Sequence, residues 1–316
     1  MLATTPFDVV TFGETMVLLT PLEPAPLEGS SGFRSAVAGT ESNCAIGLAR
    51  LGYSVAWVSR LGKDPFGKKV LKTIRGEGVD VARVEMDNDA PTGLMFKEAG
   101  VAGQSHVYYY RKGSAASRLH SKLFEGLVSR FLFVTGITPA LSEQNRELTL
   151  HVVDQFKSGG TTVVFDPNMR YKLWSADAAR EVFLQVAHKC DVLLPSLDEA
   201  KILSGLTSLE DMAVALLQLG PKRVAIKAGD QGSYFADDET RGFVPPFRVR
   251  EVDPVGAGDA YCAGVISGLL DNLPFREAVE RGCAMGAICV MSYGDYAAPD
   301  RQELEGFLTG TRTQAR

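Results

Sequence analysis

The sequence predicts an α/β protein with a central, mostly parallel sheet and a second, smaller sheet. From residue 131 onward, short apolar segments alternate with helical ones, which is typical of βαβ units in a parallel sheet. Residues 92–97 and 106–111 are rich in Thr, Tyr, Phe and Val, and glycines lie between them. This pattern indicates a hairpin, which can form the smaller sheet together with residues 16–19.

The elements of the first half are predicted from local patterns. Residues 7–12 form a first strand that ends at Gly13-Glu14, and residues 16–19 form a second. A segment rich in Pro, Glu and Ser follows at 21–31 and is predicted to be a loop or lid connection. The next predicted elements are a helix at 44–52, a strand at 55–58 and a helix that ends near residue 77.

The second half supplies the parallel sheet and its ligand-binding edge. Its predicted strands are 131–134, 162–165, 192–194 and 224–226, and a late helix spans 276–291. Ligands of such sheets bind beyond the carboxyl ends of the strands. Polar residues stand at each of these ends, in the segments 136–138, 166–170, 196–199 and 227–230. We therefore expect a binding site along this edge.

Residues 253–259, Asp-Pro-Val-Gly-Ala-Gly-Asp, lead into an apolar segment that is predicted to be a buried helix. Gly256 and Gly258 permit a sharp turn and remove side chains that would block a ligand. The N–H groups at a helix start have no partner inside the helix and carry positive potential, which suits a phosphate. Asp259 can take the proton of an attacking hydroxyl. The alternative is that Asp259 only caps the helix.

Two motif-like segments point elsewhere and are rejected. Residues 62–69 contain Gly-x4-Gly-Lys, as in a P-loop, but Lys69 stands where Ser or Thr would hold Mg²⁺. Pro65 also lacks a backbone N–H for the phosphate, so we predict a turn that introduces a helix. Gly256-x-Gly258 is a fragment of the dinucleotide fingerprint, but Tyr261 replaces its third glycine. The fragment also lies near the chain end, which disfavours an oxidoreductase.

Composition restricts the partners and the compartment. The chain has 316 residues, of which 45% are hydrophobic and 22% charged, and its net charge of −5 gives no sign of a nucleic-acid-binding surface. The N-terminus lacks the regions of a signal peptide, and no apolar run approaches the ~20 residues that span a bilayer. The five cysteines lack metal-ligand spacing. We expect a cytoplasmic protein that binds neither nucleic acid nor membrane.

The run at 253–259 closely resembles the C-terminal signature of the ribokinase-like (PfkB) carbohydrate kinases. This resemblance implies a ribokinase-like three-layer sandwich, one kinase domain over residues 1–316, and a β-sheet lid formed by about residues 15–37 and 92–112. It implies ATP and Mg²⁺ as cofactors and Asp259 as the catalytic base. The backbone of Gly256, Ala257 and Gly258 would form the anion hole. Lids of this family often make dimer contacts, so a homo-oligomer through the lid is expected.

Two arginines indicate an acidic acceptor. A sugar acid needs a cation, preferably the forked guanidinium of arginine. Arg111 follows three tyrosines and shares a strand face with Tyr109, and Arg170 stands at a strand end. Together they can hold a carboxylate. The alternative for Arg111 is a surface arginine that lies over apolar lid residues.

Residues 109–115, 135–139, 166–174 and 294–295 narrow the resemblance to the 2-keto-3-deoxygluconate kinases, which phosphorylate the 6-hydroxyl of that small sugar acid. By this resemblance, the acceptor site comprises Gly39, Asn43, Tyr109, Arg111, Ile137, Arg170 and Asp295. The nucleotide site comprises Ser196, Lys227, Gly229, Gly232, Gly256 and Gly258. Glu199 would hold Mg²⁺ through water, and Asp253 is the implied site for a monovalent cation such as K⁺.

The chain departs from the family pattern at three positions. Ala38 replaces the first glycine of a Gly-Gly pair, Ser196 replaces the Asn of an Asn-x-x-Glu motif, and Met95 replaces a tyrosine of some keto-deoxygluconate kinases. The last change removes a possible hydroxyl contact to the acid. A fructokinase or another neutral-sugar kinase of the same family is therefore the main alternative. An inactive binding protein on the same fold is a second alternative.

Overall fold

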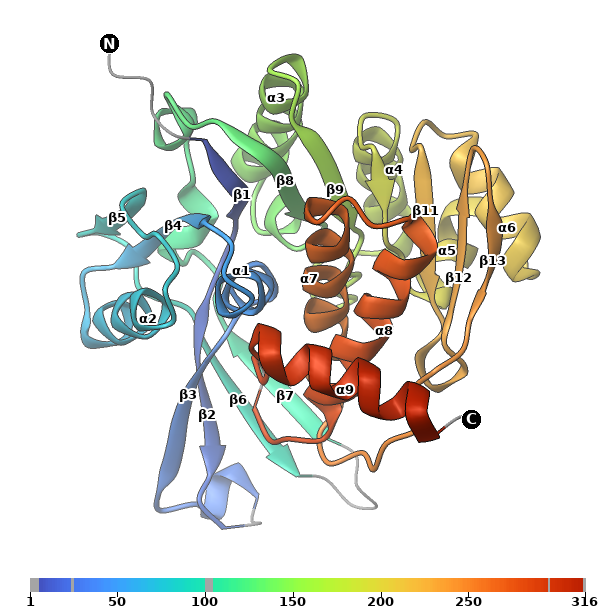
Figure 1. Ribbon diagram of the computed structural model, residues 1–316. Helices are drawn as coiled ribbons and strands as arrows, with labels where there is room; N and C mark the ends of the chain where they lie inside the picture. Colours follow the sequence, from blue (N-terminus) through green and yellow to red (C-terminus); the bar gives the residue numbers. More distant parts are fainter. Residues whose placement is uncertain (1–5, 24–25, 100–104, 295, 315–316) are drawn as a thin grey trace.

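The computed structural model describes residues 6–23, 26–99, 105–294 and 296–314 (Figure 1). In this part of the chain, the larger sheet has nine strands in the order β13-β12-β11-β10-β9-β8-β1-β4-β5. β12 is antiparallel to β11 and β13, and the other neighbours are parallel. The strands are β1 (Phe7–Phe12), β4 (Val55–Gly62), β5 (Val84–Asp87), β8 (Ser129–Thr135), β9 (Thr162–Asp166), β10 (Val192–Leu193), β11 (Arg223–Lys227), β12 (Ser233–Asp237) and β13 (Arg241–Val244).

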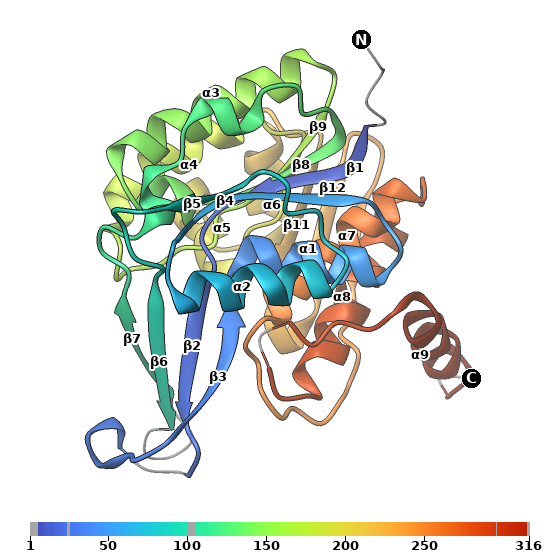
Figure 2. The ribbon, with the colours of Figure 1, turned by 90° about the vertical axis from the view of Figure 1, so that its left-hand side faces the viewer.

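Alternate residues of these strands face two separate cores. In β1, Val9 packs into one core and Val10 into the other, and Phe133 and Leu132 of β8 divide in the same way. Helices cover both faces (Figure 2), which confirms the predicted sandwich and mostly parallel sheet. One face carries α1 (Thr40–Arg50), α2 (Pro65–Gly76), α7 (Ala257–Leu270), α8 (Phe275–Val290) and α9 (Arg301–Gln314). The other carries α3 (Glu143–Ser158), α4 (Ala176–Ala187), α5 (Leu197–Ser204) and α6 (Leu209–Leu217).

A smaller sheet extends from the main body (Figures 1 and 2). Its order is β3-β2-β6-β7, and we call it the lid sheet. Its strands are β2 (Met16–Pro21), β3 (Phe33–Ala38), β6 (Leu94–Ala99) and β7 (Ser105–Tyr110). β6 and β7 pair antiparallel, as the hairpin prediction required. β3 was not predicted, because its first three residues are exposed and carry no apolar alternation.

Two helix starts can be compared with the sequence predictions, those of α1 and α2. α1 begins at Thr40, four residues earlier than predicted, because Gly39 already accepts the first helical bond from the N–H of Asn43 (2.7 Å). The segment at 62–69 forms a capped helix start: an oxygen of Asp64 accepts the N–H of Gly67 (2.7 Å) at the start of α2. Among the described residues, no helix combines the length and apolar character needed to cross a membrane.

Candidate active site

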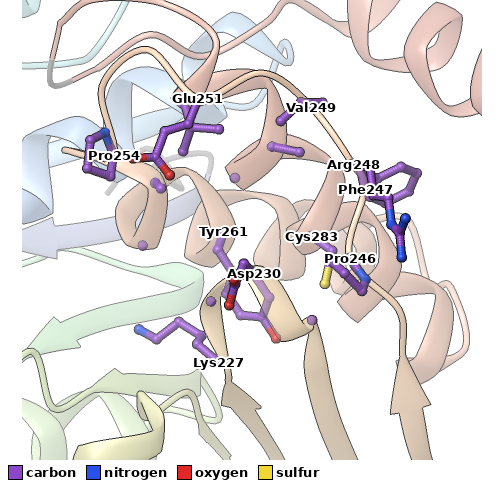
Figure 3. Close-up of a pocket in the computed structure, with 17 residues that line it drawn as sticks. Lys227, Asp230, Pro246, Phe247, Arg248, Val249, Glu251, Pro254, Tyr261 and Cys283 are labelled. Carbon is purple, nitrogen blue, oxygen red and sulfur yellow. The ribbon is translucent and has the colours of Figure 1, made fainter.

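Two cavities meet along the carboxyl ends of the parallel strands. The first, about 510 Å³, lies beside residues 246–254 and the helices α7 and α8 (Figure 3). The second, about 670 Å³, lies between this edge of the main sheet and the lid sheet. We call them the nucleotide cavity and the acceptor cavity. Both are lined by Lys227, Gly229, Pro254 and Gly258, so a group can pass from a ligand in one to a ligand in the other.

The start of α7 lies at this junction. Gly256 has φ +81°, a backbone conformation in which residues with side chains are strained. In the described chain no side chain caps this first turn, and a Cβ at Gly258 would project into open space. The N–H groups of the turn can therefore face a ligand, and the helix dipole adds positive potential there. This geometry fits the predicted anion hole.

Asp259 follows in the same turn and lies at the acceptor cavity. Its side chain is buried, and one oxygen accepts the side-chain N–H of Asn43 (2.8 Å). Burial raises the pKa of Asp259 to about 7, although the Asn43 hydrogen bond and the charges of Arg170 and Lys227 oppose this rise. A carboxyl group with a pKa near neutrality can accept and return a proton at physiological pH. Asn43 therefore contacts the Asp259 carboxyl group directly, and its buried side-chain oxygen has no partner among the described residues.

A buried ion pair supports the junction of the cavities. The Nζ of Lys227, at the end of β11, lies 2.8 Å from an oxygen of Asp166 at the end of β9. Burial alone would lower the pKa of Lys227, but the Asp166 carboxylate and the neighbouring acidic groups raise it above its ordinary value. Lys227 is therefore a permanent cation where the two cavities meet. The strand-end rule identified both residues correctly as part of one edge.

Arg111 is buried and paired, which corrects the idea of a surface arginine. Its Nε lies 2.6 Å from an oxygen of Glu14, and a second guanidinium nitrogen contacts the same oxygen. The other Glu14 oxygen accepts the hydroxyl of Ser114 (2.5 Å), and the guanidinium carbon lies 5.5 Å from the centre of the Tyr109 ring. Sequence reasoning missed Glu14, although it lies two residues beyond the end of β1 at the ligand-binding edge, where the strand-end rule applies.

Arg170 has a different environment. It is exposed, donates to the carbonyl oxygen of Met169 (3.3 Å) and forms no ion pair with a described carboxylate. The acceptor cavity also contains the predicted residues Gly39, Asn43, Tyr109, Arg111 and Ile137. Asp295, the remaining predicted member, lies outside the described residues. The structure therefore brings six of the seven predicted acceptor residues to one cavity.

Glu199 lies in the first turn of α5 and closes a capping box with Ser196. One Glu199 oxygen accepts the N–H of Ser196 (2.7 Å) and the other accepts the N–H of Met169 (2.7 Å). Each oxygen keeps a second lone pair. Mg²⁺ prefers oxygen donors and retains several waters, so this fixed carboxylate in the acceptor cavity fits a water-mediated role. Among the described residues, no group of three His, Cys, Asp or Glu side chains forms a direct metal cage.

Asp253 already has a cation. The Nζ of Lys97, in β6, lies 3.2 and 3.1 Å from its two carboxylate oxygens. The carboxylate assigned by the sequence to a monovalent cation is thus neutralised by a lysine of the lid sheet. A free ion would have to displace this ammonium group, so the side chain does not fit the implied K⁺ site as it stands. Sequence reasoning missed Lys97, because 156 residues separate the two partners.

The nucleotide cavity holds four of the six predicted nucleotide residues, Lys227, Gly229, Gly232 and Gly258. Ser196 and Gly256 lie at the acceptor cavity instead. Figure 3 shows further lining residues that sequence reasoning missed. They are Pro246, Phe247, Arg248, Val249 and Glu251 from the segment before α7, Tyr261 of α7 and Cys283 of α8. One pattern in the sequence could have predicted this wall. Helical spacing places Cys283, Gly286, Ala287 and Val290 on one face of α8.

Comparisons with known proteins show what the chain is similar to. The profile of the pfkB family carbohydrate kinases matches residues 7–301. A 2-dehydro-3-deoxygluconokinase of Bacillus subtilis (strain 168) is 42% identical over 313 residues, which cover 97% of each chain. Fructokinase-1 of Oryza sativa subsp. japonica is 33% identical over 90% of this chain and 92% of its own. The crystal structure of a 2-dehydro-3-deoxygluconokinase from Thermotoga maritima superimposes with a TM-score of 0.88, at 25% identity, over 97% of this chain and 99% of that chain.

Proposed function

Because the chain belongs to the pfkB family of carbohydrate kinases, we propose that it transfers a phosphoryl group from ATP to the 6-hydroxyl of 2-keto-3-deoxygluconate (2-dehydro-3-deoxygluconate). One observation carries this proposal. A single cavity holds a carboxyl group with a pKa of about 7, Asp259, and two guanidinium groups, those of Arg111 and Arg170. A sugar acid needs a base at its hydroxyl end and a cation at its acid end.

The transfer step follows from the residues at the junction. The Asp259 carboxylate takes the proton of the acceptor hydroxyl, whose oxygen forms the new bond to the γ-phosphorus as the bond to the ADP oxygen breaks. The N–H groups of residues 256–258 and the Lys227 ammonium stabilise the charge on the transferring oxygens. Mg²⁺, when bound, neutralises charge on the ATP phosphates, and Glu199 would hold it through water.

Acid recognition divides between the two arginines. Arg111 is oriented by Glu14 and backed by Tyr109, so its direction is fixed before the substrate binds. Its charge is largely balanced by Glu14. Arg170 is exposed at the same cavity, so it supplies the charge that the acceptor carboxylate must neutralise. We assign Arg170 as the main carboxylate-binding residue and Arg111 as the residue that orients the acid.

The acceptor cavity also contains hydrogen-bond acceptors that suit a neutral sugar. Glu14 sits beside Arg111 at the acceptor cavity and can accept sugar hydroxyls, as can the unpartnered oxygen of Asn43. A fructokinase would use these acceptors and leave Arg170 outside the reaction. The two functions therefore differ in what they require of Arg170.

A coupled ATP assay with 2-keto-3-deoxygluconate and fructose tests the proposal. Wild type should prefer the acid, and Arg170→Leu should lose about tenfold to a hundredfold in kcat/KM for it, since a charge-assisted hydrogen bond contributes about 1.5–3 kcal/mol. Fructose turnover should change much less. A matched control is Lys112→Leu, which removes an exposed cation just beyond β7. Preference of wild type for fructose would replace the acid proposal with the neutral-sugar one.

We further propose that the protein forms a homo-oligomer through the outer face of the lid sheet. Phe33, Phe96 and Tyr110 form an aromatic row there, with ring centres 5.8 and 5.5 Å apart, and Tyr110 is 68% exposed. Tyr110→Glu should shift the sedimentation coefficient to that of a monomer. Tyr293→Glu, at an 81% exposed tyrosine elsewhere, should not. An unchanged oligomer in Tyr110→Glu, or a monomeric wild type, would contradict this interface.

A cytoplasmic location is part of the same proposal. All five cysteines lie within the described residues, and none of them forms a disulfide. Four of them are buried, and burial raises the pKa of Cys190 and Cys262 above the ordinary value. Inert, reduced thiols are typical of proteins in a reducing compartment. Fractionation of the source cells with an antibody to the chain would test this location.

A further inference from the structure

One ion pair joins the lid sheet to the loop that begins the anion hole. Lys97 lies in β6 of the lid sheet, and Asp253 lies six residues before Asp259. The ammonium contacts both carboxylate oxygens, at 3.2 and 3.1 Å. The two side chains are only 16% and 15% exposed, so solvent screens the pair less than it screens a surface salt bridge.

On the loop side, Asp253 is part of the turn that leads into α7. The oxygen that contacts Lys97 at 3.2 Å also accepts the N–H of Val255 (3.2 Å). The backbone N–H of Asp253 donates to the carbonyl oxygen of Val290 at the end of α8 (3.2 Å). Gly256 follows directly with its positive φ. The position of the Asp253 carboxylate therefore influences how the first N–H groups of α7 are presented.

On the lid side, Lys97 shares a strand face with Met95. Met95 pairs with Tyr109 and Lys97 pairs with Val107 across the hairpin. All four of these residues line the acceptor cavity. An acceptor that packs against Met95 and Tyr109 must therefore hold this face of the lid sheet, and Lys97 with it, over the cavity.

We propose that Lys97 is a positioning residue that couples acceptor binding under the lid sheet to the geometry of the anion-hole loop. The acceptor fixes β6 and β7, β6 carries Lys97, and Lys97 holds Asp253 and the turn before Gly256. This inference rests on the proposed kinase function, because it presumes an acceptor in one cavity and a phosphoryl donor in the other. Since such coupling is reciprocal, a nucleotide on the anion hole must strengthen acceptor binding by the same factor.

Two other roles for Lys97 make different predictions. A direct ligand of the acceptor carboxylate would affect the affinity for an acid and not for a neutral sugar, and would act with or without nucleotide. A purely structural tie would affect unfolding and leave the coupling intact. The coupling factor, which is the ratio of acceptor Kd values without and with a non-hydrolysable ATP analogue, separates the three roles.

The test compares wild type with Lys97→Met, Asp253→Asn and the double variant. Asp253→Asn keeps an oxygen for the N–H of Val255 and removes only the charge. Calorimetric titration with 2-keto-3-deoxygluconate, with and without the ATP analogue and Mg²⁺, should give a coupling factor of about fivefold or more for wild type. Each single variant should bring this factor towards one and lower kcat on the order of tenfold. The double variant should be no worse than either single variant, because both remove the same interaction.

Matched variants complete the design. Lys97→Arg, which keeps the charge, should retain most of the coupling, and Lys112→Met, at an exposed lysine beyond β7, should behave as wild type. An unchanged coupling factor in both Lys97→Met and Asp253→Asn overturns the proposal, as does an additive double variant. If wild type phosphorylates fructose and not the acid, the same titrations are made with fructose. Failure of the substrate assignment and failure of the coupling are therefore distinguishable.

Discussion

The two ends of the acceptor cavity are built in different ways. Near α7, the proposed chemistry rests on main-chain N–H groups and one carboxyl group within residues 256–259. At the lid end, it rests on side chains that are far apart in sequence, such as Arg111 and Glu14. A local motif can form the first end, but only the complete fold can form the second. We therefore expect substitutions at the α7 end to remove catalysis for every acceptor, and substitutions at the lid end to change the choice among acceptors.

The largest expected effect tests the α7 end. Asp259→Asn keeps the shape of the side chain and an oxygen for the Asn43 hydrogen bond, but it removes the base. The kcat should fall by roughly 10²–10⁴-fold, and it should fall equally for 2-keto-3-deoxygluconate and for fructose. Steady-state assays with both sugars measure this loss. ATP affinity, measured by titration, should be nearly unchanged, and near-normal turnover would exclude Asp259 as the base.

The next effect tests the lid end. Glu14→Gln leaves the buried Arg111 guanidinium without its counter-charge, and breaking a buried pair costs about 3–5 kcal/mol of unfolding free energy. Chemical denaturation measures this cost. Glu14→Gln combined with Arg111→Leu should recover part of the stability, because no unpaired charge remains. This double variant can then be assayed: we expect a tenfold to hundredfold loss of kcat/KM for the acid. The loss for fructose should be smaller, because the amide that replaces the Glu14 carboxylate keeps one oxygen for sugar hydroxyls.

These contrasts also explain what the sequence could and could not predict. The glycine turn and the position of Asp259 at the start of α7 were predictable because glycine, a helix start and a carboxylate are contiguous. The parallel sheet was predictable because its strands are apolar on both faces. Strand β3 was missed, since its exposed half resembles a loop. The partners of Arg111 and Asp253 were missed because ion pairs between distant residues leave no local pattern, and Arg111 was consequently assigned more free charge than it has.

A third prediction uses pH to probe the base. The pKa of Asp259 is raised to about 7, chiefly by burial, and only the ionised carboxylate can accept the hydroxyl proton. Activity should therefore rise about tenfold per pH unit below pH 7 and level off above it. Asn43→Ala removes the hydrogen bond that lowers this pKa, so its profile should shift to higher pH. A pH profile that is flat between pH 5 and 8 would contradict the assignment.

The raised pKa of Asp259 also makes the unfolding free energy depend on pH. The pKa is raised in the folded protein above the ordinary 3.8, so between about pH 4 and 7 the folded state binds more protons at Asp259 than the unfolded state does. The unfolding free energy should therefore fall as pH rises through this window. Asp259→Asn should lack this component, so it should be at least as stable as wild type at pH 7. Denaturation curves at pH 5 and 7 for both proteins measure the difference.

The smallest expected effect concerns Glu199. This residue lines the acceptor cavity and fixes the N–H groups of Ser196 and Met169. Glu199→Gln keeps one oxygen acceptor and loses the other, so unfolding should become easier by only about 1 kcal/mol. The Mg²⁺ concentration for half-maximal activity should rise, because the water-mediated charge is gone.

Asp198→Asn is the control, since Asp198 is a neighbouring acid whose side chain is 82% exposed. If both variants shift the Mg²⁺ requirement equally, general surface charge is responsible. If only the stability of Glu199→Gln changes, Glu199 is a helix-capping residue and the metal is held elsewhere.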